Sequence, residues 1–294
     1  MSLKEVITEE AKGFNGVIGV SVKNLDTGEY AEVNGDMLFP TASVFKVPVI
    51  VEFFRQIGNN RIKIEDQTLL REKDKVPGSG ILKELSEGMP VSYKDLLSLM
   101  MIVSDNTATD IIVKKVGFEN INNTMREFGL NNTKVTKYCR QILFDLVGLN
   151  NLELDEMTIN VFNEATENRY YSGSWSLKTK DNNVSTPKEM TRLLELITEG
   201  KAASEESCQK ILEIMAKSQT GPYRIPKYLP SKEVILQRKT GSLPGIRNDV
   251  GIITIKERGK IYIISCFTRE AENNYEAEEV IARISQKVYN YFSS

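Results

Sequence analysis

The sequence of 294 residues contains no histidine. A Ser-His-Asp triad is therefore excluded, and so is any metal site that needs an imidazole ligand. Any serine chemistry in this chain must take its base from a lysine or a carboxylate. We expect the protein to need neither a metal nor an organic cofactor.

Cysteine is scarce: Cys139, Cys208 and Cys266 lie far apart and are odd in number. One disulfide is possible, but this spacing indicates no disulfide framework. Each cysteine is expected to behave as a small buried apolar residue.

Long apolar runs are also missing, so no segment is predicted to span a membrane. Four charged residues interrupt the first ten positions, which is not typical of a signal peptide: Lys4, Glu5, Glu9 and Glu10. The first three residues are typical of an engineered start. We expect a secreted or cell-surface protein if a signal peptide was removed, and a cytoplasmic one otherwise.

Charge of one sign is not in excess, since 38 basic and 40 acidic residues give a net charge of −2. This balance points to neither a nucleic-acid partner nor a membrane surface. Apolar residues make up 40% and charged residues 27%, as in ordinary soluble proteins. The length allows one large domain or two small ones, and we expect a monomer.

A serine stands three residues before a lysine at the start of a predicted helix. Apolar residues recur at helical spacing through this segment: Val44, Val47, Ile50, Val51 and Phe54. Positions i and i+3 share a helix face, so the Ser43 hydroxyl and the Lys46 ammonium can meet. A desolvated lysine can serve as a base, and free N–H groups at a helix start can hold an oxyanion. The alternative is a helix-start serine followed by a solvated lysine.

Two further motifs follow in order, Ser104-Asp105-Asn106 after an apolar helix and Lys239-Thr240-Gly241-Ser242 near the chain end. Taken singly, the first can be a helix cap and the second a strand ending in a turn. The order Ser-x-x-Lys, Ser-Asp-Asn, Lys-Thr-Gly is the signature of class A β-lactamases and penicillin-binding proteins. The chain therefore resembles the class A β-lactamase family over most of its length.

Two more segments carry the resemblance, a loop at 78–82 and a helix start at 185–190. It implies an α+β fold with two lobes: a five-stranded antiparallel sheet flanked by the terminal helices, and an all-helical lobe. We expect a single β-lactamase-like domain over 1–294. Its α/β lobe would span about 1–45 and 200–294, its helical lobe about 46–199, with the site in the cleft between them.

The hydrophobic patterns predict the same elements. Terminal helices are expected over Leu3–Lys12 and Ala277–Phe292. Five runs rich in β-branched and aromatic residues are predicted strands: Val17–Val22, Tyr30–Val33, Val234–Leu236, Val250–Ile255 and Ile261–Phe267. Helical periodicity predicts five further helices: Tyr93–Val103, Thr107–Val116, Glu119–Phe128, Pro187–Glu199 and Glu205–Ser218.

The resemblance implies a catalytic role for the first motif. Ser43 would attack the carbonyl of a β-lactam, or a related amide or ester, and form an acyl-enzyme. Lys46 is a candidate base for this step, and a glutamate acting through water is its rival. Backbone N–H groups of Ser43 and Ser242 would form the oxyanion hole. Ser104 would pass a proton to the leaving nitrogen, while Asp105 organises the turn.

The resemblance also implies substrate-binding roles. Asn106 would hold the side-chain amide of the substrate. Lys239, at a strand end, would attract the substrate carboxylate, and Thr240 and Ser242 would donate hydrogen bonds. Gly241 would let a flat substrate lie close to the strand backbone.

The chain departs from the family in the loop that supplies the glutamate for deacylation, usually written Glu-x-x-Leu-Asn. The catalytic candidate is Glu156, which begins a Glu-x-x-Ile-Asn run but lies after an apolar segment, 141–149, that the common enzymes lack. Counting by position puts 140–145 where the loop should begin, and no glutamate is there. Glu164 is a further candidate. Each carboxylate can equally be a surface charge in an inserted loop.

Two functions therefore remain open. With a working glutamate, the protein is a serine hydrolase that opens and hydrolyses β-lactams. Without one, it is a penicillin-binding or peptidase- or esterase-like relative whose acyl-enzyme persists. A binding protein with a vestigial site conflicts with the presence of all three motifs.

Overall fold

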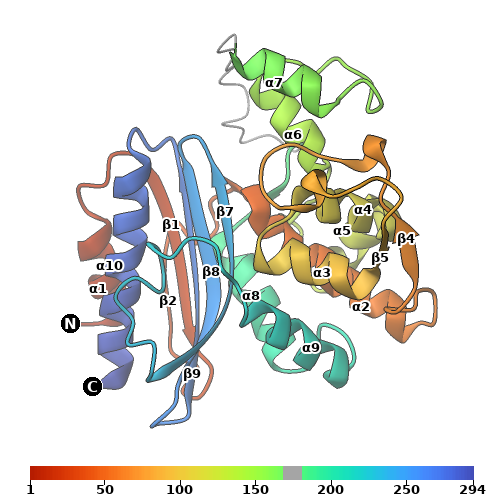
Figure 1. The fold of residues 1–294 in the computed structure, drawn as a ribbon. Helices are drawn as coiled ribbons and strands as arrows, with labels where there is room; N and C mark the ends of the chain where they lie inside the picture. The colour runs from red at the N-terminus through yellow and green to blue at the C-terminus, as the bar shows by residue number, and fades with distance from the viewer. Residues whose placement is uncertain (168–180) are drawn as a thin grey trace.

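The computed structural model describes residues 1–167 and 181–294, in which a β-sheet packs beside a group of helices (Figure 1). The sheet has five antiparallel strands in the order β2-β1-β9-β8-β7. Their bounds are β1 Val17–Asn24, β2 Tyr30–Val33, β7 Val234–Leu243, β8 Ile246–Ile255 and β9 Lys260–Arg269. The predicted sheet, with two early and three late strands, is confirmed.

The terminal helices α1, Leu3–Ala11, and α10, Asn274–Ser293, lie together on one face of the sheet (Figure 1). Apolar side chains of alternate strand positions meet them in one buried cluster, which includes Ile7, Val20 and Val280. The predicted flanking helices are confirmed. A capping box of Ser2 and Glu5 starts α1.

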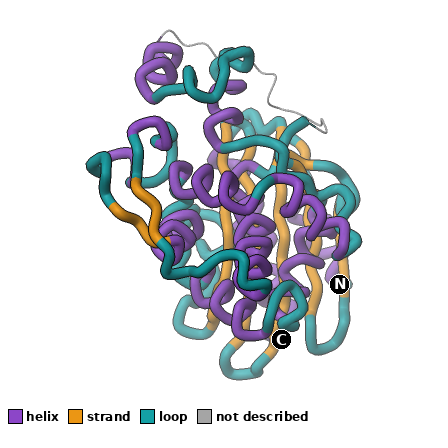
Figure 2. The backbone as a smooth tube through the Cα atoms, turned by 90° about the vertical axis from the view of Figure 1, so that its right-hand side faces the viewer, coloured by secondary structure: helices purple, strands orange, loops and turns teal. Residues whose placement is uncertain are grey.

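The opposite face of the sheet meets the helical part of the chain, which Figure 2 shows in front of the strands. Its helices are α2 Lys46–Gly58, α3 Tyr93–Ile102, α4 Asn106–Val116, α5 Phe118–Glu127, α6 Cys139–Leu146, α7 Ile159–Glu167, α8 Pro187–Thr198 and α9 Glu205–Met215. The short 3-10 helices are η1 Ala42–Phe45, η2 Glu72–Asp74 and η3 Leu82–Glu84. Two small sheets pair β3 Phe39–Pro40 with β6 Val184–Ser185, and β4 Gln67–Leu69 with β5 Pro90–Ser92.

Helix α2 runs through the centre of this part and is buried along most of its length, because its apolar residues point in all directions. Helix α8 packs against β1 and β9, and α9 packs against α2 and β7. Helix α8 lies within the predicted helical lobe, about 46–199, and yet contacts the sheet directly. The predicted division into lobes at about 46 and 199 stays a prediction.

Two local predictions differ from the structure. Ser43 lies in η1, one 3-10 turn before α2, and not in the α-helix itself. Strand β7 continues through the Lys239–Ser242 motif, where the sequence predicted a strand end. The apolar segment 141–149 is the body of α6 and the turn after it.

The three cysteines are free and buried, as predicted for small apolar residues. Among residues 1–167 and 181–294, no helix combines the length and the hydropathy needed to cross a bilayer. The end of the predicted inserted loop, 168–180, lies outside the described residues.

Candidate active site

Ser43 lies where η1 presses against β7. A Cβ atom on Gly241 would lie 2.4 Å from the Thr41 carbonyl oxygen and 3.1 Å from the Ser43 nitrogen, so only glycine fits. Asn248 fixes the entry to η1 by donating to the Thr41 carbonyl at 3.1 Å. The main chain of Ser43 thus lies beside that of the motif strand, which an oxyanion hole built from both requires.

Backbone strain marks the residue before the nucleophile. Ala42 has φ of 43°, in the left-handed region that non-glycine residues rarely occupy. Such strain persists only where the surrounding structure enforces it, and here β7 does so through its contact with η1. The strained turn directs Ser43 into a cavity while Val44 enters the core; Phe45 is buried and also lines the cavity.

Lys46 is completely buried directly below this turn. Its Nζ donates to the Ser104 carbonyl at 2.7 Å, to Ser104 Oγ at 3.0 Å and to Asn106 Oδ1 at 3.0 Å. Burial lowers the pKa of Lys46, so its neutral, basic form is more accessible than in water. The Ser43 hydroxyl has no hydrogen-bond partner in the described part of the chain, and catalytic hydrogen bonds often tighten only with substrate.

Ser104 joins the two lysines of the site. Its hydroxyl lies 3.0 Å from Lys46 Nζ and 3.0 Å from Lys239 Nζ. Its φ of 58° is also left-handed. Burial, and then the charge of Lys46, set the pKa of Lys239 well below its ordinary value. Two ammonium groups around one hydroxyl repel each other, which favours the neutral form of one of the two lysines.

Asp105 organises the turn, as predicted. Its Oδ1 accepts from Ala108 N at 2.9 Å and caps α4, and its Oδ2 accepts from Ile81 N at 2.6 Å and Leu82 N at 2.8 Å. A Cβ on Gly80 would lie 2.2 Å from Asp105 Oδ2, so the loop is packed tightly here. The motif is therefore a helix cap and part of the site at once.

The structure places the predicted binding residues around the same point. Asn106 is buried, with its amide nitrogen donating to the Pro77 carbonyl at 3.0 Å in addition to its bond with Lys46. Lys239 is fully buried and also donates to the Thr240 carbonyl at 2.8 Å. Ser242 lines the cavity. The three motifs are thereby brought to one place.

A further buried cation, Arg224, lies behind the motif strand and was not predicted from the sequence. Arg224 is buried and donates to the Gly241 carbonyl at 3.0 Å, the Asn248 carbonyl at 2.8 Å and the Ser242 hydroxyl. It also pairs with Glu278 at 3.0 Å. The local sequence at Arg224 is an ordinary turn-rich stretch, so no pattern signals this role.

The cavity at Ser43 has a volume of about 70 Å³. Its walls combine motif residues, including Ser43, Asn106 and Ser242, with three residues of α6, namely Cys139, Ile142 and Leu143. No described carboxylate lines it. The sequence of 168–180 contains no aspartate or glutamate either.

Cys139, Ile142 and Leu143 line the cavity and have the spacing of the family pattern Glu-x-x-Leu-Asn. Burial raises the pKa of the Cys139 thiol to about 12, so it is protonated at neutral pH and cannot act as a base. Leu143 has no polar atom to hold a water molecule.

Glu156 and Glu164, the two glutamates predicted as candidate bases for deacylation, do not line the cavity at Ser43. Glu156 is exposed and accepts from the Glu153 backbone nitrogen at 2.8 Å, in the turn before α7. Glu164 is exposed on α7, which extends from the top of the molecule in Figure 1. Neither lines the cavity, so the structure does not bring these candidates to Ser43.

A buried aspartate fixes the start of α6. Asp110 accepts from Cys139 N at 2.6 Å and from Arg140 N at 3.1 Å. Burial raises the pKa of Asp110 from 3.8 to about 6, against the lowering effect of these two hydrogen bonds. The position of Cys139 and Leu143 is thus set by a carboxylate on α4.

This raised pKa predicts a pH-dependent stability. The folded protein holds the Asp110 proton more tightly than the unfolded chain, so stability is lost as pH rises through the window from about 4 to 6. In Asp110→Asn that loss is absent. Between pH 4 and 7 the free energy of unfolding of the variant should gain about 2 kcal/mol on the wild type.

Urea unfolding at both pH values measures this difference. Asp155→Asn, at an exposed aspartate, is the matched control and should show no such change. A difference between Asp110→Asn and the wild type that stays constant with pH would contradict the prediction.

Comparisons with known proteins agree with the fold. The model of the β-lactamase enzyme family matches residues 2–292. β-Lactamase VEB-1 of Pseudomonas aeruginosa is 26% identical over 96% of this chain and 87% of its own length. A crystal structure of a β-lactamase from Sphaerobacter thermophilus is 26% identical, with a TM-score of 0.80 over 99% of this chain and 97% of that one. A mutant of PBP-A, in an acyl-enzyme complex with penicillin G, is 24% identical, with a TM-score of 0.79 over 99% of this chain and 96% of that one.

Proposed function

Because this chain belongs to the class A β-lactamase family, whose members hydrolyse β-lactams, we propose that Ser43 is its acylated nucleophile. The observation that carries the proposal is the hydrogen-bonded group of Lys46, Ser104 and Lys239 beside a strained Ser43 turn. The group supplies a base, a proton carrier and a positive field at one point. No metal takes part in this scheme.

The reaction follows from the positions of these groups. Neutral Lys46 takes the proton of the Ser43 hydroxyl as its oxygen attacks the β-lactam carbonyl carbon. Backbone N–H groups of Ser43 and Ser242 hold the oxyanion, each donor contributing about 3 kcal/mol. The ring C–N bond then breaks, and the proton returns from Lys46 through Ser104 to the leaving nitrogen. The product is an ester on Ser43.

We further propose that hydrolysis of this ester is the slow step. The supporting observation is that Cys139 and Leu143 stand at the cavity positions where the family pattern has glutamate and asparagine. A protonated thiol and an alkyl group cannot activate water, so the acyl group should persist. The alternative, rapid turnover with Glu156 or Glu164 as base, requires those exposed residues to reach Ser43.

Intact-protein mass spectrometry after mixing with penicillin G tests both steps, beside a colour assay with a chromogenic cephalosporin. We expect one penicillin adduct that lasts and little colour. Ser43→Ala should form no adduct while its melting curve stays unchanged. A transient adduct with rapid colour would contradict slow deacylation but would leave Ser43 as the nucleophile. An adduct that survives in Ser43→Ala would overturn the nucleophile.

Lys239 is the cation that would bind a carboxylate on the substrate. It lies in β7 three residues before Ser242 of the cavity wall, and its Nζ is 3.0 Å from Ser104 Oγ. A bound carboxylate would favour its ammonium form. Lys239→Ala is expected to slow acylation by a carboxylate-bearing penicillin by about 10-fold or more, in line with a lost charge-assisted contact. A neutral ester of the same penicillin should lose much less. Acylation rates of the wild type and Lys239→Ala with both compounds measure this difference. An equal loss of rate with the penicillin and with its ester would contradict a role of Lys239 in binding the carboxylate.

We also propose that the protein works as a monomer, because every group of the site comes from one chain. Sedimentation at the concentrations used for the assays measures this directly. A dimer whose dissociation abolishes acylation would contradict it.

A further inference from the structure

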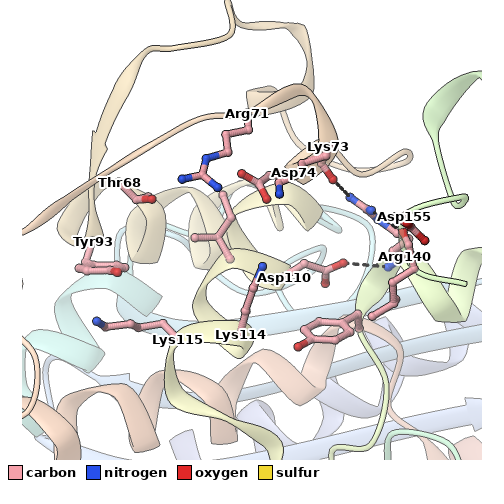
Figure 3. A pocket seen from close by; sticks show the side chains of 13 residues that line it. Thr68, Arg71, Lys73, Asp74, Tyr93, Asp110, Lys114, Lys115, Arg140 and Asp155 are labelled. Carbon is pink, nitrogen blue, oxygen red and sulfur yellow. Dashed lines mark hydrogen bonds between the residues drawn. The ribbon is translucent and has the colours of Figure 1, made fainter.

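A second cavity, of about 470 Å³, lies on the other side of the start of α6 (Figure 3). Its volume is in the range of small-molecule sites, roughly 300–1,000 Å³. It shares no lining residue with the cavity at Ser43. One wall is the segment from Thr68 to Asp74, and the facing wall is α4 with the first turn of α6. Tyr93 and Leu154 also line it.

The cavity carries an excess of positive charge. Five cationic side chains and three carboxylates line it: Arg71, Lys73, Lys114, Lys115, Arg140, Asp74, Asp110 and Asp155. Across the described ranges, no carboxylate lies within ion-pair distance of these cations. The Arg140 guanidinium donates to three carbonyls, those of Lys73, Lys75 and Leu154, which hold its charge in place without neutralising it.

The carboxylates leave this excess largely intact. Both oxygens of Asp110 already accept backbone N–H groups of α6. Figure 3 shows Lys114 extending from α4 toward Arg71 and Asp74 on the facing segment. Within the described part of the chain, neither Arg71 nor Lys114 has an ion-pair partner, so an anion between them would meet two unpaired cations.

Two aromatic rings, those of Tyr93 and Tyr138, also line this charged cavity. The Tyr93 ring lies under Lys115, 5.4 Å from its Nζ, and packs on Phe53. The Tyr138 ring is fixed by an edge contact with Phe118, 4.7 Å between centroids. Flat, rigid walls of this kind favour a ring-shaped ligand.

We propose that this cavity binds a small molecule that carries a phosphate monoester on a flat ring. The phosphate would lie between Arg71 and Lys114, where a dianion matches the surplus charge, and the ring would lie against tyrosine. Tyr138 and Arg140 line this cavity and Cys139 between them lines the other. The two sites therefore share one short wall but no ligand contacts.

Calorimetric titration of the whole protein with phenyl phosphate tests the proposal. We expect saturable binding with an affinity that falls as salt is added, because exposed charges are screened. Phenol and inorganic phosphate, each half of the probe, should bind at least about 10-fold more weakly. Arg71→Gln and Lys114→Gln should each weaken phenyl phosphate binding about 10-fold or more. Lys94→Gln, at an exposed lysine of α3 outside the cavity, should not.

Ser43→Ala and the penicillin-treated protein separate this site from the catalytic one, since both should bind phenyl phosphate as the wild type does. All variants should keep the wild-type melting temperature without ligand. Loss of binding in the penicillin-treated protein would place the probe in the Ser43 cavity and overturn the proposal. Three other outcomes would also overturn the proposal. They are an unchanged affinity for phenyl phosphate in both Arg71→Gln and Lys114→Gln, binding of phenol as tight as that of phenyl phosphate, and no binding of phenyl phosphate at millimolar concentration.

Discussion

Lys46→Ala should slow acylation of Ser43 by penicillin by about 10²–10⁴-fold, the usual contribution of a general base. Lys46 is the buried amine beneath the Ser43 turn, and burial holds its pKa below the ordinary value. In this protein no described carboxylate lines the cavity to act through water in its place. The loss should therefore be the full effect of removing the base.

Quench-flow mass spectrometry of the adduct gives the acylation rate for the wild type and the variant. Lys94→Ala, at an exposed lysine of α3, is the control and should acylate as the wild type does. The substitution at Lys46 leaves buried acceptors on Ser104 and Asn106 unpaired, so melting curves must accompany the rates. A folded Lys46→Ala protein that acylates within about 10-fold of the wild type would show that another group takes the Ser43 proton.

The sheet could be predicted from the sequence because its strands are short runs rich in β-branched and aromatic residues, a pattern typical of buried or half-buried strands. The position at which β7 ends could not be predicted from the sequence. Thr240, Gly241 and Ser242 have the composition of a turn, yet they stay in the strand because Ser242 pairs with Arg247 of β8. Gly241 is glycine here because η1 leaves no room for a Cβ, and not because the chain turns.

The nucleophile and its lysines could be predicted because three short motifs keep their residue types and order. The opposite wall of the cavity could not be predicted, since Cys139 and Leu143 do not match the polar residue types of the family pattern Glu-x-x-Leu-Asn. Only the fold shows their place, through the hydrogen bonds of Asp110 to the start of α6. Arg224 was missed for a similar reason, because a single cation in a turn carries no pattern.

Restoring the polar pair on α6 should convert a persistent acyl-enzyme into a rapidly hydrolysed one. In Cys139→Glu with Leu143→Asn, a carboxylate and an amide would face the ester on Ser43 and hold a water molecule between them. The gain in deacylation rate should be about 10²–10⁴-fold, the range for general-base catalysis. The acylation rate should change far less, because Lys46 and Ser104 are untouched.

The time course of adduct loss after removal of excess penicillin G measures this gain. Cys139→Gln with Leu143→Asn is the matched control, since it adds the same volume and polarity without a base, and it should deacylate slowly. Glu156→Gln in the wild-type background tests the exposed rival and should leave the slow rate unchanged. If Glu156→Gln slowed deacylation, or if the glutamate and glutamine variants released penicillin at the same rate, the missing base on α6 would not be what makes the acyl-enzyme persist.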